Sequence, residues 1–321
     1  MTPLRESDPR EIDGYSLTGR LGAGGFGVVY AATTPDGQEV AIKVLRPELS
    51  DDQGLRTRLA REAAALRSVR GDRTVQVLDV VTEGRWAYLV MELVGGDTLE
   101  SQVKNDGPLQ GPMLWFVSEG LVEALADIHA AGIVHRDLKP SNVMFGPGGV
   151  KVLDFGISRS LEGSGAHTVG ALGTPTYMAP EQWTDAQVDG RADIYSLGVL
   201  LYELLTGARP FNGSVEALYE KHQKQPVPPI PAGRGVPKTL EKIIRRAMEK
   251  LPDDRFNSAG EMATALESAF VASIDDWIAF SPEFKKDDSL LSGQSSSRRP
   301  LSVRKLAMIL IGVIAVGLAV V

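Results

Sequence analysis

The residues best suited to chemistry lie in the run His135–Asn142, which reads HRDLKPSN. A carboxylate at Asp137 and a carboxamide at Asn142, five residues later, would place a proton acceptor and a Mg²⁺ ligand in one loop. Lys139 would direct a positive charge at a phosphoryl group in transfer. Asp154 opens an Asp-Phe-Gly run twelve residues after Asn142 and would supply a second oxygen ligand for Mg²⁺. The spacing is suited to phosphoryl transfer.

A glycine-rich segment, Gly22–Gly27, matches the pattern G-x-G-x-x-G, and Val29 follows it. Glycines let a backbone lie close over phosphates with its amides turned toward them. Alone the match is weak, because about 0.4 such matches are expected by chance at this glycine content. The context strengthens it: Lys43 ends the apolar run VAIK, and Glu62 in a later helical stretch is its natural partner. Lys43, held by a carboxylate, would grip phosphates.

His135 is interpreted differently from its neighbours. A lone histidine beside apolar residues is more often a hydrogen-bonded core residue than a catalyst, and we expect that of His135. Downstream, Ala179-Pro180-Glu181 closes the segment that begins at Asp154.

The elements that must position these residues divide the chain into two parts. Residues 15–94 have the pattern of strands and turns, with one helical stretch, RLAREAAALRSV, and an apolar strand, LVMEL. After residue 96 the pattern is helical, and residues 193–206 are apolar nearly all round, as in a buried helix. A second predicted helix places five apolar residues on one face: Leu114, Val117, Leu121, Leu125 and Ile128. We therefore expect a small strand-rich lobe followed by a larger helical lobe.

The two ends of the chain differ. The N-terminal residues are charged and have no apolar core of a secretory signal. Residues 293–300 form a Ser-rich linker, and residues 306–321 carry no charge. Sixteen helical residues reach roughly 24 Å, somewhat short of a bilayer core, but Arg304 and Lys305 would extend the span by snorkelling. We interpret this run as a membrane anchor, with a buried core helix as the alternative.

Composition excludes several functions. The chain has 321 residues, 43% of them hydrophobic, which is enough for a sizeable core. It has no cysteine, so disulfides, thiolate catalysis and cysteine-based zinc sites are ruled out. With 34 Lys+Arg against 41 Asp+Glu, the net charge is −7. An acidic chain lacks the dense basic surface that nucleic-acid backbones require, so nucleic acid is not an expected partner.

These motifs together resemble one family, the eukaryotic-like serine/threonine protein kinases of bacteria. The Gly-rich loop, VAIK, HRDLKPSN, DFG and APE occur in the family's order and spacing. The resemblance implies an α+β bilobal kinase fold over residues 15–270, with an N-lobe at 15–94 and a C-lobe at 95–270. Around it we expect a tail at 1–14, a juxtamembrane linker at 271–304 and a transmembrane helix at 305–321. One local departure is GDRTVQVLDV, where many members have a His-Pro-Asn-Ile-Val run.

The resemblance also implies roles. Asp137 would orient the substrate hydroxyl and accept its proton, Lys139 would stabilise the γ-phosphoryl group, and Lys43, fixed by Glu62, would bind the α- and β-phosphates of ATP. Asn142 and Asp154 would hold Mg²⁺, with Mn²⁺ as a possible substitute. Asp193 would hold the catalytic loop, and Arg255 would pair with Glu181. The expected ATP-binding residues are Leu21, Gly22, Ala23, Gly24, Gly25, Phe26, Gly27, Val29, Ala41, Lys43, Met91 at the gatekeeper position, Glu92 and Val94 through their backbones, and Met144.

Substrates, regulation and partners are expected from the same resemblance. Lys139 and the run at residues 173–177 are typical of kinases that act on Ser and Thr of proteins. Thr168 is the expected autophosphorylation site, where a phosphate would pair with Arg136 and order the loop; Ser164 is a weaker candidate. The basic residues before the apolar run would keep the kinase domain cytoplasmic and attract anionic membrane lipid. Small residues in the run hint at a homodimer that would favour phosphorylation in trans: Gly312, Ala315 and Ala319.

Two alternatives belong to other classes. A catalytically inactive scaffold kinase usually lacks the lysine, the catalytic aspartate or the metal-binding aspartate, and all three are present here. A small-molecule kinase of related fold commonly lacks both DFG and APE. Incubation with labelled ATP, Mg²⁺ and a generic protein acceptor would separate these alternatives from a protein kinase.

Overall fold

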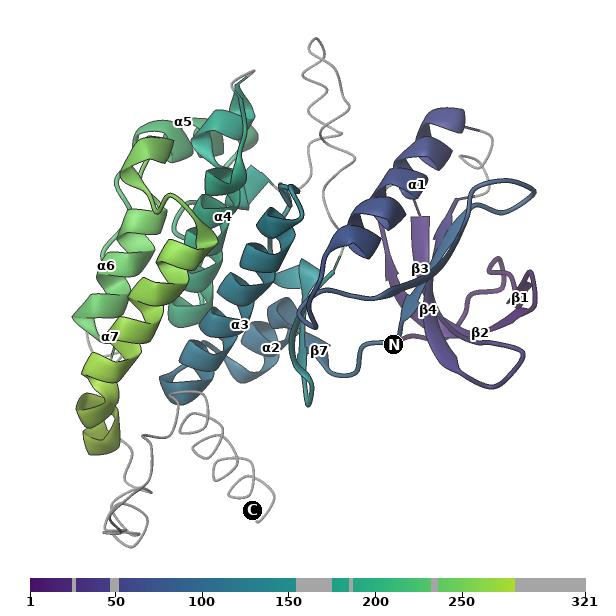
Figure 1. Ribbon diagram of the computed structural model, residues 1–321, viewed down its shortest axis with the longest axis horizontal. Helices are drawn as coiled ribbons and strands as arrows, with labels where there is room; N and C mark the ends of the chain where they lie inside the picture. The colour runs from purple at the N-terminus through teal and green to yellow at the C-terminus, as the bar shows by residue number, and fades with distance from the viewer. Residues whose placement is uncertain (25–26, 47–51, 154–174, 185–186, 232–235, 281–321) are drawn as a thin grey trace, which may run out of the picture.

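The computed structural model describes residues 1–24, 27–46, 52–153, 175–184, 187–231 and 236–280, and shows two lobes side by side (Figure 1). The first lobe is a sheet covered by one helix, and the second is a bundle of helices. The strand-rich lobe and the helical lobe therefore follow each other along the chain as predicted.

The sheet of the N-lobe has six antiparallel strands in the order β1-β2-β3-β4-β6-β5. Residues on its two faces enter two different cores: Ala41, Leu89 and Met91 face the large core shared with the helices, whereas Ile42 and Val90 belong to a separate small core. The strands are β1 (Glu11–Ile12), β2 (Tyr15–Ala23), β3 (Gly27–Thr33), β4 (Glu39–Leu45), β5 (Val77–Val81) and β6 (Tyr88–Glu92).

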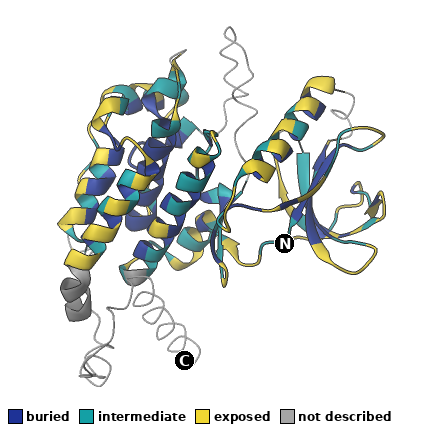
Figure 2. Cartoon of the chain, viewed as in Figure 1, coloured by how far each residue is buried: buried dark blue, intermediate teal, exposed yellow. Residues whose placement is uncertain are grey.

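Helix α1 (Gln53–Ser68) covers one face of this sheet. It begins after Asp52, whose Oδ1 accepts hydrogen bonds from the backbone N–H groups of Gly54 and Leu55 at 2.8 and 3.1 Å. Such a cap satisfies amides that have no partner within the helix. The helix buries a stripe at helical spacing, formed by Leu55, Leu59, Ala63 and Leu66, and its other face is exposed (Figure 2).

The N-terminal residues, expected to form a separate tail, pack on the N-lobe. Thr2 pairs with Arg20 of β2 through two backbone hydrogen bonds of 2.9 and 2.8 Å. The buried carboxylate of Asp8 accepts hydrogen bonds from the Arg20 guanidinium at 2.8 Å and from the Tyr30 hydroxyl at 2.9 Å. Burial alone would raise the pKa of Asp8, but the Arg5 amide, Tyr30 and Arg20 together hold this pKa below its usual range. The segment therefore continues the sheet of the lobe.

The C-lobe is built around helix α4, which is buried nearly all round (Figure 2). Asp189 caps its start, and Gly207, in a left-handed conformation with φ of 74°, ends it. In α3 the predicted apolar face is confirmed, since all five residues are at most 2% exposed. The helices of this lobe are α2 (Leu99–Asp106), α3 (Gly111–Ala130), α4 (Gly190–Thr206), α5 (Val215–Lys224), α6 (Lys238–Ala247) and α7 (Ala259–Phe280).

Short elements carry the residues of chemical interest. A small sheet in the order β7-β8-β9 lies beside the helices and is formed by Asp97–Thr98, Val143–Gly146 and Gly149–Val152. The described part of this lobe also contains the 3₁₀ turns η2 (Pro140–Asn142), η4 (Pro175–Tyr177), η5 (Pro180–Trp183) and η6 (Pro252–Asp254).

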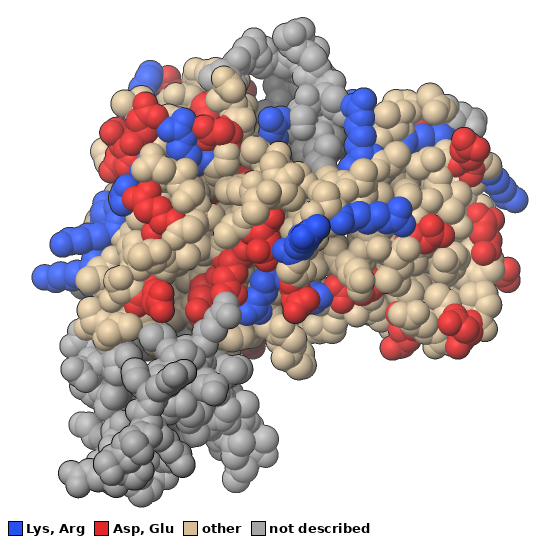
Figure 3. Space-filling model, viewed as in Figure 1, with Lys and Arg blue, Asp and Glu red and all other residues tan. Residues whose placement is uncertain are grey.

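The C-terminal helix α7 continues through residue 270 to Phe280. Among the residues that the structure describes, no helix is both long and apolar enough to cross a bilayer. The predicted anchor at 305–321 and most of the predicted linker lie outside those residues. On the face shown in Figure 3, basic and acidic side chains are interspersed over both lobes.

Candidate active site

The catalytic loop is anchored by one buried carboxylate. Asp193 of α4 is fully buried, and its two oxygens accept hydrogen bonds from the backbone N–H groups of His135 and Arg136, each at 2.8 Å. The Nε2 atom of His129 lies 2.8 Å from the same carboxylate. Because α4 is itself locked in the core, these contacts fix the backbone that leads into Asp137. The structure thus confirms the expected role of Asp193.

The carboxylate of Asp137 is held between two side chains of its own loop. Lys139 Nζ lies 2.8 Å from Asp137 Oδ2. Asn142 Nδ2 donates to the backbone oxygen of Asp137 at 2.9 Å and to Oδ2 at 3.2 Å. The loop therefore brings the side chains of Asp137, Lys139 and Asn142 together.

The Asn142 contacts also show that the loop suits a divalent cation. Because its Nδ2 is committed to Asp137, the amide presents Oδ1 as the atom for a metal ion. Oxygen ligands of this kind match the preference of Mg²⁺. Asp154, the second predicted ligand, lies outside the described residues.

His135 has the structural role expected of it. It is fully buried, and its Nε2 lies 3.3 Å from the backbone oxygen of Leu153. The backbone N–H of Leu153 also donates to the oxygen of Asn142 at 2.8 Å. These two contacts attach Leu153, which follows β9 and directly precedes Asp154, to the catalytic loop.

In the N-lobe, Lys43 of β4 and Glu62 of α1 form the predicted pair. Lys43 Nζ lies 2.7 Å from Glu62 Oε1, and the side chains are 22% and 13% exposed. Strand and helix are thereby joined across the space beside the sheet, and the ammonium group is held on the face that carries Ala41 and Met91. This is the geometry expected of a lysine that binds phosphates.

The glycine-rich loop contains two kinds of glycine. A Cβ on Gly27 would lie 2.4 Å from the backbone oxygen of Val44, so only glycine fits at this position of β3. A Cβ on Gly22 or Gly24 would meet no atom within 4 Å. Contacts with the described residues therefore do not account for Gly22 and Gly24, and each has open space on the side where a Cβ would lie. Gly25 and Phe26 lie outside the described residues.

The predicted adenine walls lie on neighbouring strands. Ala41 is directly opposite Met91 across the β4–β6 ladder, and Lys43 is opposite Val29 across the β3–β4 ladder. Met91 is only 6% exposed, as expected of a gatekeeper residue at the back of the site. Other predicted residues are less buried: Leu21 and Ala23 at the end of β2, Val94 after β6 and Met144 on β8.

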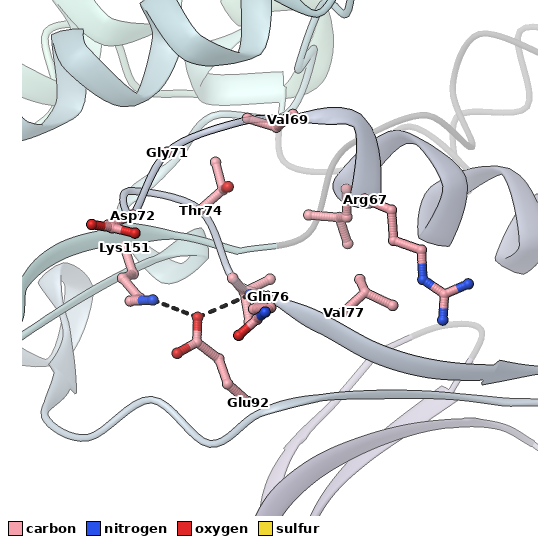
Figure 4. Close-up of a pocket in the computed structure, with 11 residues that line it drawn as sticks. Arg67, Val69, Gly71, Asp72, Thr74, Gln76, Val77, Glu92 and Lys151 are labelled. Atoms are coloured by element: carbon pink, nitrogen blue, oxygen red, sulfur yellow. Dashed lines mark hydrogen bonds and ion pairs between the residues drawn. The ribbon is translucent and has the colours of Figure 1, made fainter.

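The side chain of Glu92 makes contacts of its own, whereas the sequence indicated a role only for its backbone. Its Oε1 pairs with Lys151 of β9 and accepts a hydrogen bond from the backbone N–H of Gln76 at 2.9 Å (Figure 4). The three residues lie in a cleft of about 290 Å³ between the end of α1, β5 and β9. The side chain of Glu92 therefore ties the segment expected to bind adenine to β9 and to the backbone of Gln76.

A second ion pair supports the end of the segment from Asp154 to Glu181, called the activation segment below. Arg255 is 1% exposed, and its Nη1 and Nη2 lie 2.7 and 2.8 Å from the two oxygens of Glu181 on η5. Its remaining donors bond to the backbone oxygens of Arg191, Glu249 and Lys250. A bidentate buried pair of this kind fixes η5 against α4, as predicted for Arg255 and Glu181.

The contacts thus form two groups, Lys43 with Glu62 in the N-lobe and Asp137 with Lys139 and Asn142 in the C-lobe. The family model described as "Protein kinase domain" matches residues 15–271. This chain belongs to the protein kinase family. The kinase domain therefore accounts for both lobes.

Named relatives agree with this assignment. The chain is 38% identical over 276 residues to the probable serine/threonine-protein kinase PkwA of Thermomonospora curvata, covering 86% of this chain and 36% of that protein. It is 37% identical over 265 residues to the serine/threonine-protein kinase PknB of Mycobacterium tuberculosis, covering 79% and 42%. The chain thus spans about two fifths or less of the length of these relatives. Among solved structures, the PknI kinase domain of M. tuberculosis matches with a TM-score of 0.62 at 28% identity, covering 81% of this chain and 97% of that one.

Proposed function

We propose that this chain is a serine/threonine protein kinase, which transfers the γ-phosphate of ATP to Ser or Thr hydroxyls of protein substrates. One observation carries the proposal: Asp137 is held by Lys139 and Asn142 in a loop that Asp193 fixes, while Lys43 is paired with Glu62 on the other lobe. The named relatives are serine/threonine-protein kinases, which supports the substrate class.

Each residue has a defined task in this reaction. The Asp137 carboxylate orients the substrate hydroxyl and accepts its proton as the oxygen–phosphorus bond forms and ADP leaves. Lys139, 2.8 Å from that carboxylate, is placed to neutralise charge on the transferred group. Lys43 holds the α- and β-phosphates, and Glu62 holds Lys43. Catalysis then consists mainly of positioning and charge neutralisation.

Asn142 and Asp154 would hold a Mg²⁺ ion, for which Mn²⁺ is a possible substitute. Such an ion would supply positive charge that neutralises the phosphates of the nucleotide. The committed Nδ2 of Asn142 supports this role, because it leaves the oxygen of the amide for the metal.

The test is the variant Asp137→Asn with labelled ATP, Mg²⁺ and a generic protein acceptor. We expect ATP binding and thermal stability close to wild type, with kcat below about a tenth of the wild-type value, because the proton acceptor alone is removed. Asp106→Asn, an exposed change at the end of α2, is the matched control and should leave kcat unchanged. An Asp137→Asn enzyme with kcat above that limit would contradict the assignment of the base.

Regulation by autophosphorylation is proposed at Thr168. A phosphate there, with a charge of about −1.5 to −2, would pair with Arg136, which directly precedes the catalytic base. Thr168 lies outside the described residues. Mass spectrometry after incubation with ATP tests this, and an unmodified Thr168 in fully active enzyme would rule it out.

Membrane attachment is proposed from the apolar run at residues 306–321 and the basic residues before it. In this arrangement the kinase domain is cytoplasmic, the basic residues contact anionic lipid, and dimerisation of the anchors favours phosphorylation in trans. Residues 1–304 should fractionate as soluble protein, whereas the full chain should stay with membranes in high salt. Release of the full chain by salt would show that charge alone holds it.

A further inference from the structure

The residue immediately before the catalytic base has an unusual backbone. Arg136 has φ of 65°, in the left-handed region that side chains other than glycine, asparagine and aspartate rarely adopt. A residue persists in this conformation only when its surroundings hold it there. Asp193 holds one end, through the backbone N–H of Arg136 at 2.8 Å.

The other end is held by a side chain that the reaction described above does not use. Gln182 of η5 donates from Nε2 to the backbone oxygen of Arg136 at 3.1 Å. Its Oε1 accepts a hydrogen bond from the backbone N–H of Ala179 at 2.9 Å. Since an N–H only donates and a carbonyl only accepts, these two partners fix the orientation of the Gln182 amide. Each of its two polar atoms therefore has one assigned partner.

The Arg136 oxygen and the Asp137 nitrogen belong to the same planar peptide unit. Gln182 holds the oxygen of this unit, and the Asp137 N–H donates to His135 Nδ1 at 3.3 Å at its other end. The orientation of the peptide plane that leads into Asp137 is thus fixed by one hydrogen bond at its oxygen and one at its nitrogen. A rotation of this plane would turn the catalytic carboxylate away from the substrate hydroxyl.

From this geometry we propose that Gln182 is a positioning residue for the catalytic base. It couples η5, at the end of the activation segment, to the peptide that carries Asp137. The buried pair of Glu181 and Arg255 anchors η5 at the residue before Gln182, so the backbone that carries Gln182 is held in place. The proposal deepens the kinase function, on which its kinetic part rests.

The test compares Gln182, which lies within η5, with Gln223, which lies outside η5 and contacts it. Gln182→Glu keeps the size of the side chain and the acceptor for Ala179, but it turns a carboxylate oxygen toward the Arg136 carbonyl. Gln223 of α5 donates to the backbone oxygen of Pro180 at 2.7 Å, so Gln223→Glu makes the same chemical change on η5 without touching the catalytic loop. The two variants separate positioning of the base from general loosening of η5.

With kcat normalised to ATP-binding stoichiometry, we expect Gln182→Glu to lose about tenfold in kcat and to keep KM for ATP within about twofold. Gln182→Ala should lose less, about threefold, because water replaces the donor. Gln223→Glu should stay within about twofold of wild type. Wild-type kcat in Gln182→Glu, or an equal loss in Gln223→Glu, would overturn the proposal.

A second measurement does not depend on activity. Hydrogen exchange followed by mass spectrometry should show faster exchange of the peptide at residues 135–138 in Gln182→Glu and unchanged exchange there in Gln223→Glu. Unchanged exchange in Gln182→Glu would also overturn the proposal. If the wild-type enzyme transferred no phosphate while this exchange difference was present, the kinase function would fail and the positioning contact would stand.

Discussion

The two lobes hold their reactive groups in different ways. In the C-lobe, Asp137 stands on a loop whose backbone is fixed by Asp193, a carboxylate without solvent exposure, and the neighbouring η5 is fixed by an equally buried arginine. In the N-lobe, Lys43 on a strand forms an ion pair with Glu62 on a helix, and the two side chains are 22% and 13% exposed.

This difference in burial predicts that substitutions in the two lobes affect stability and activity differently. Removing one partner of a buried, fully bonded charge leaves donors without acceptors, which is costly. A pair that keeps some contact with solvent costs less to break, because water can hydrate the charge that is left. We therefore expect substitutions around Asp193 to unfold the protein and substitutions at Lys43 to leave the fold intact. Three experiments test this contrast.

The largest loss of stability is expected for Asp193→Ala. The change leaves the backbone N–H groups of His135 and Arg136 and the ring of His129 without their acceptor inside the core. We expect the free energy of unfolding to fall by about 3–5 kcal/mol in urea titrations. Asp106→Ala, at the exposed end of α2, is the control and should change it by less than about 0.5 kcal/mol. A mild effect in Asp193→Ala would mean that the loop does not depend on α4.

A smaller loss of stability is expected when the pH falls, because His222 of α5 is buried without a charge. Burial, together with Lys250, lowers the pKa of His222 to about 4. Between that value and the ordinary pKa of 6.5 the unfolded chain binds a proton that the folded chain does not, so acid favours unfolding. From pH 7 to pH 5, wild type should lose about 2 kcal/mol more stability than His222→Gln. Parallel losses in the two proteins would show that other groups cause the acid sensitivity.

The smallest loss of stability is expected for Lys43→Met. Because the pair with Glu62 is partly exposed, the free energy of unfolding should change by no more than about 1 kcal/mol. Phosphoryl transfer should nevertheless fall by about 100-fold, since the phosphates lose their cation. Calorimetry and a kinase assay on the same preparation check both parts. A large drop in melting temperature would contradict the contrast between the lobes.

The sequence was sufficient to predict the two-lobed fold and the contacts within or between its motifs. The pair of Lys43 with Glu62 and the placement of Asp137, Lys139 and Asn142 in one loop follow from the motifs, and the anchoring by Asp193 follows from the family resemblance. Such motifs place residue types at fixed spacing, so their geometry transfers from one member to another.

Contacts that depend on strand register or on distant loops were not predictable. Asp8 meets partners 12 and 22 residues away only because the N-terminal segment continues the sheet. Glu92 and Lys151 are 59 residues apart and meet behind the site. Nothing in the local pattern of either residue indicates its partner, because each is an ordinary charged residue of a strand. The contact of Gln182 with Arg136 was missed for the same reason.

Three glycines of the glycine-rich loop should differ in how well they tolerate mutation. Gly27 is fixed by the oxygen of Val44, so any side chain there disturbs β3 and β4 whether or not nucleotide is bound. Gly22 and Gly24 have open space beside them, so a side chain at either position is compatible with folding. In a library selected only for soluble, abundant protein, the codon for Gly27 should therefore be preserved and those for Gly22 and Gly24 should vary. In a library selected for a growth phenotype that needs the enzyme, all three codons should be preserved.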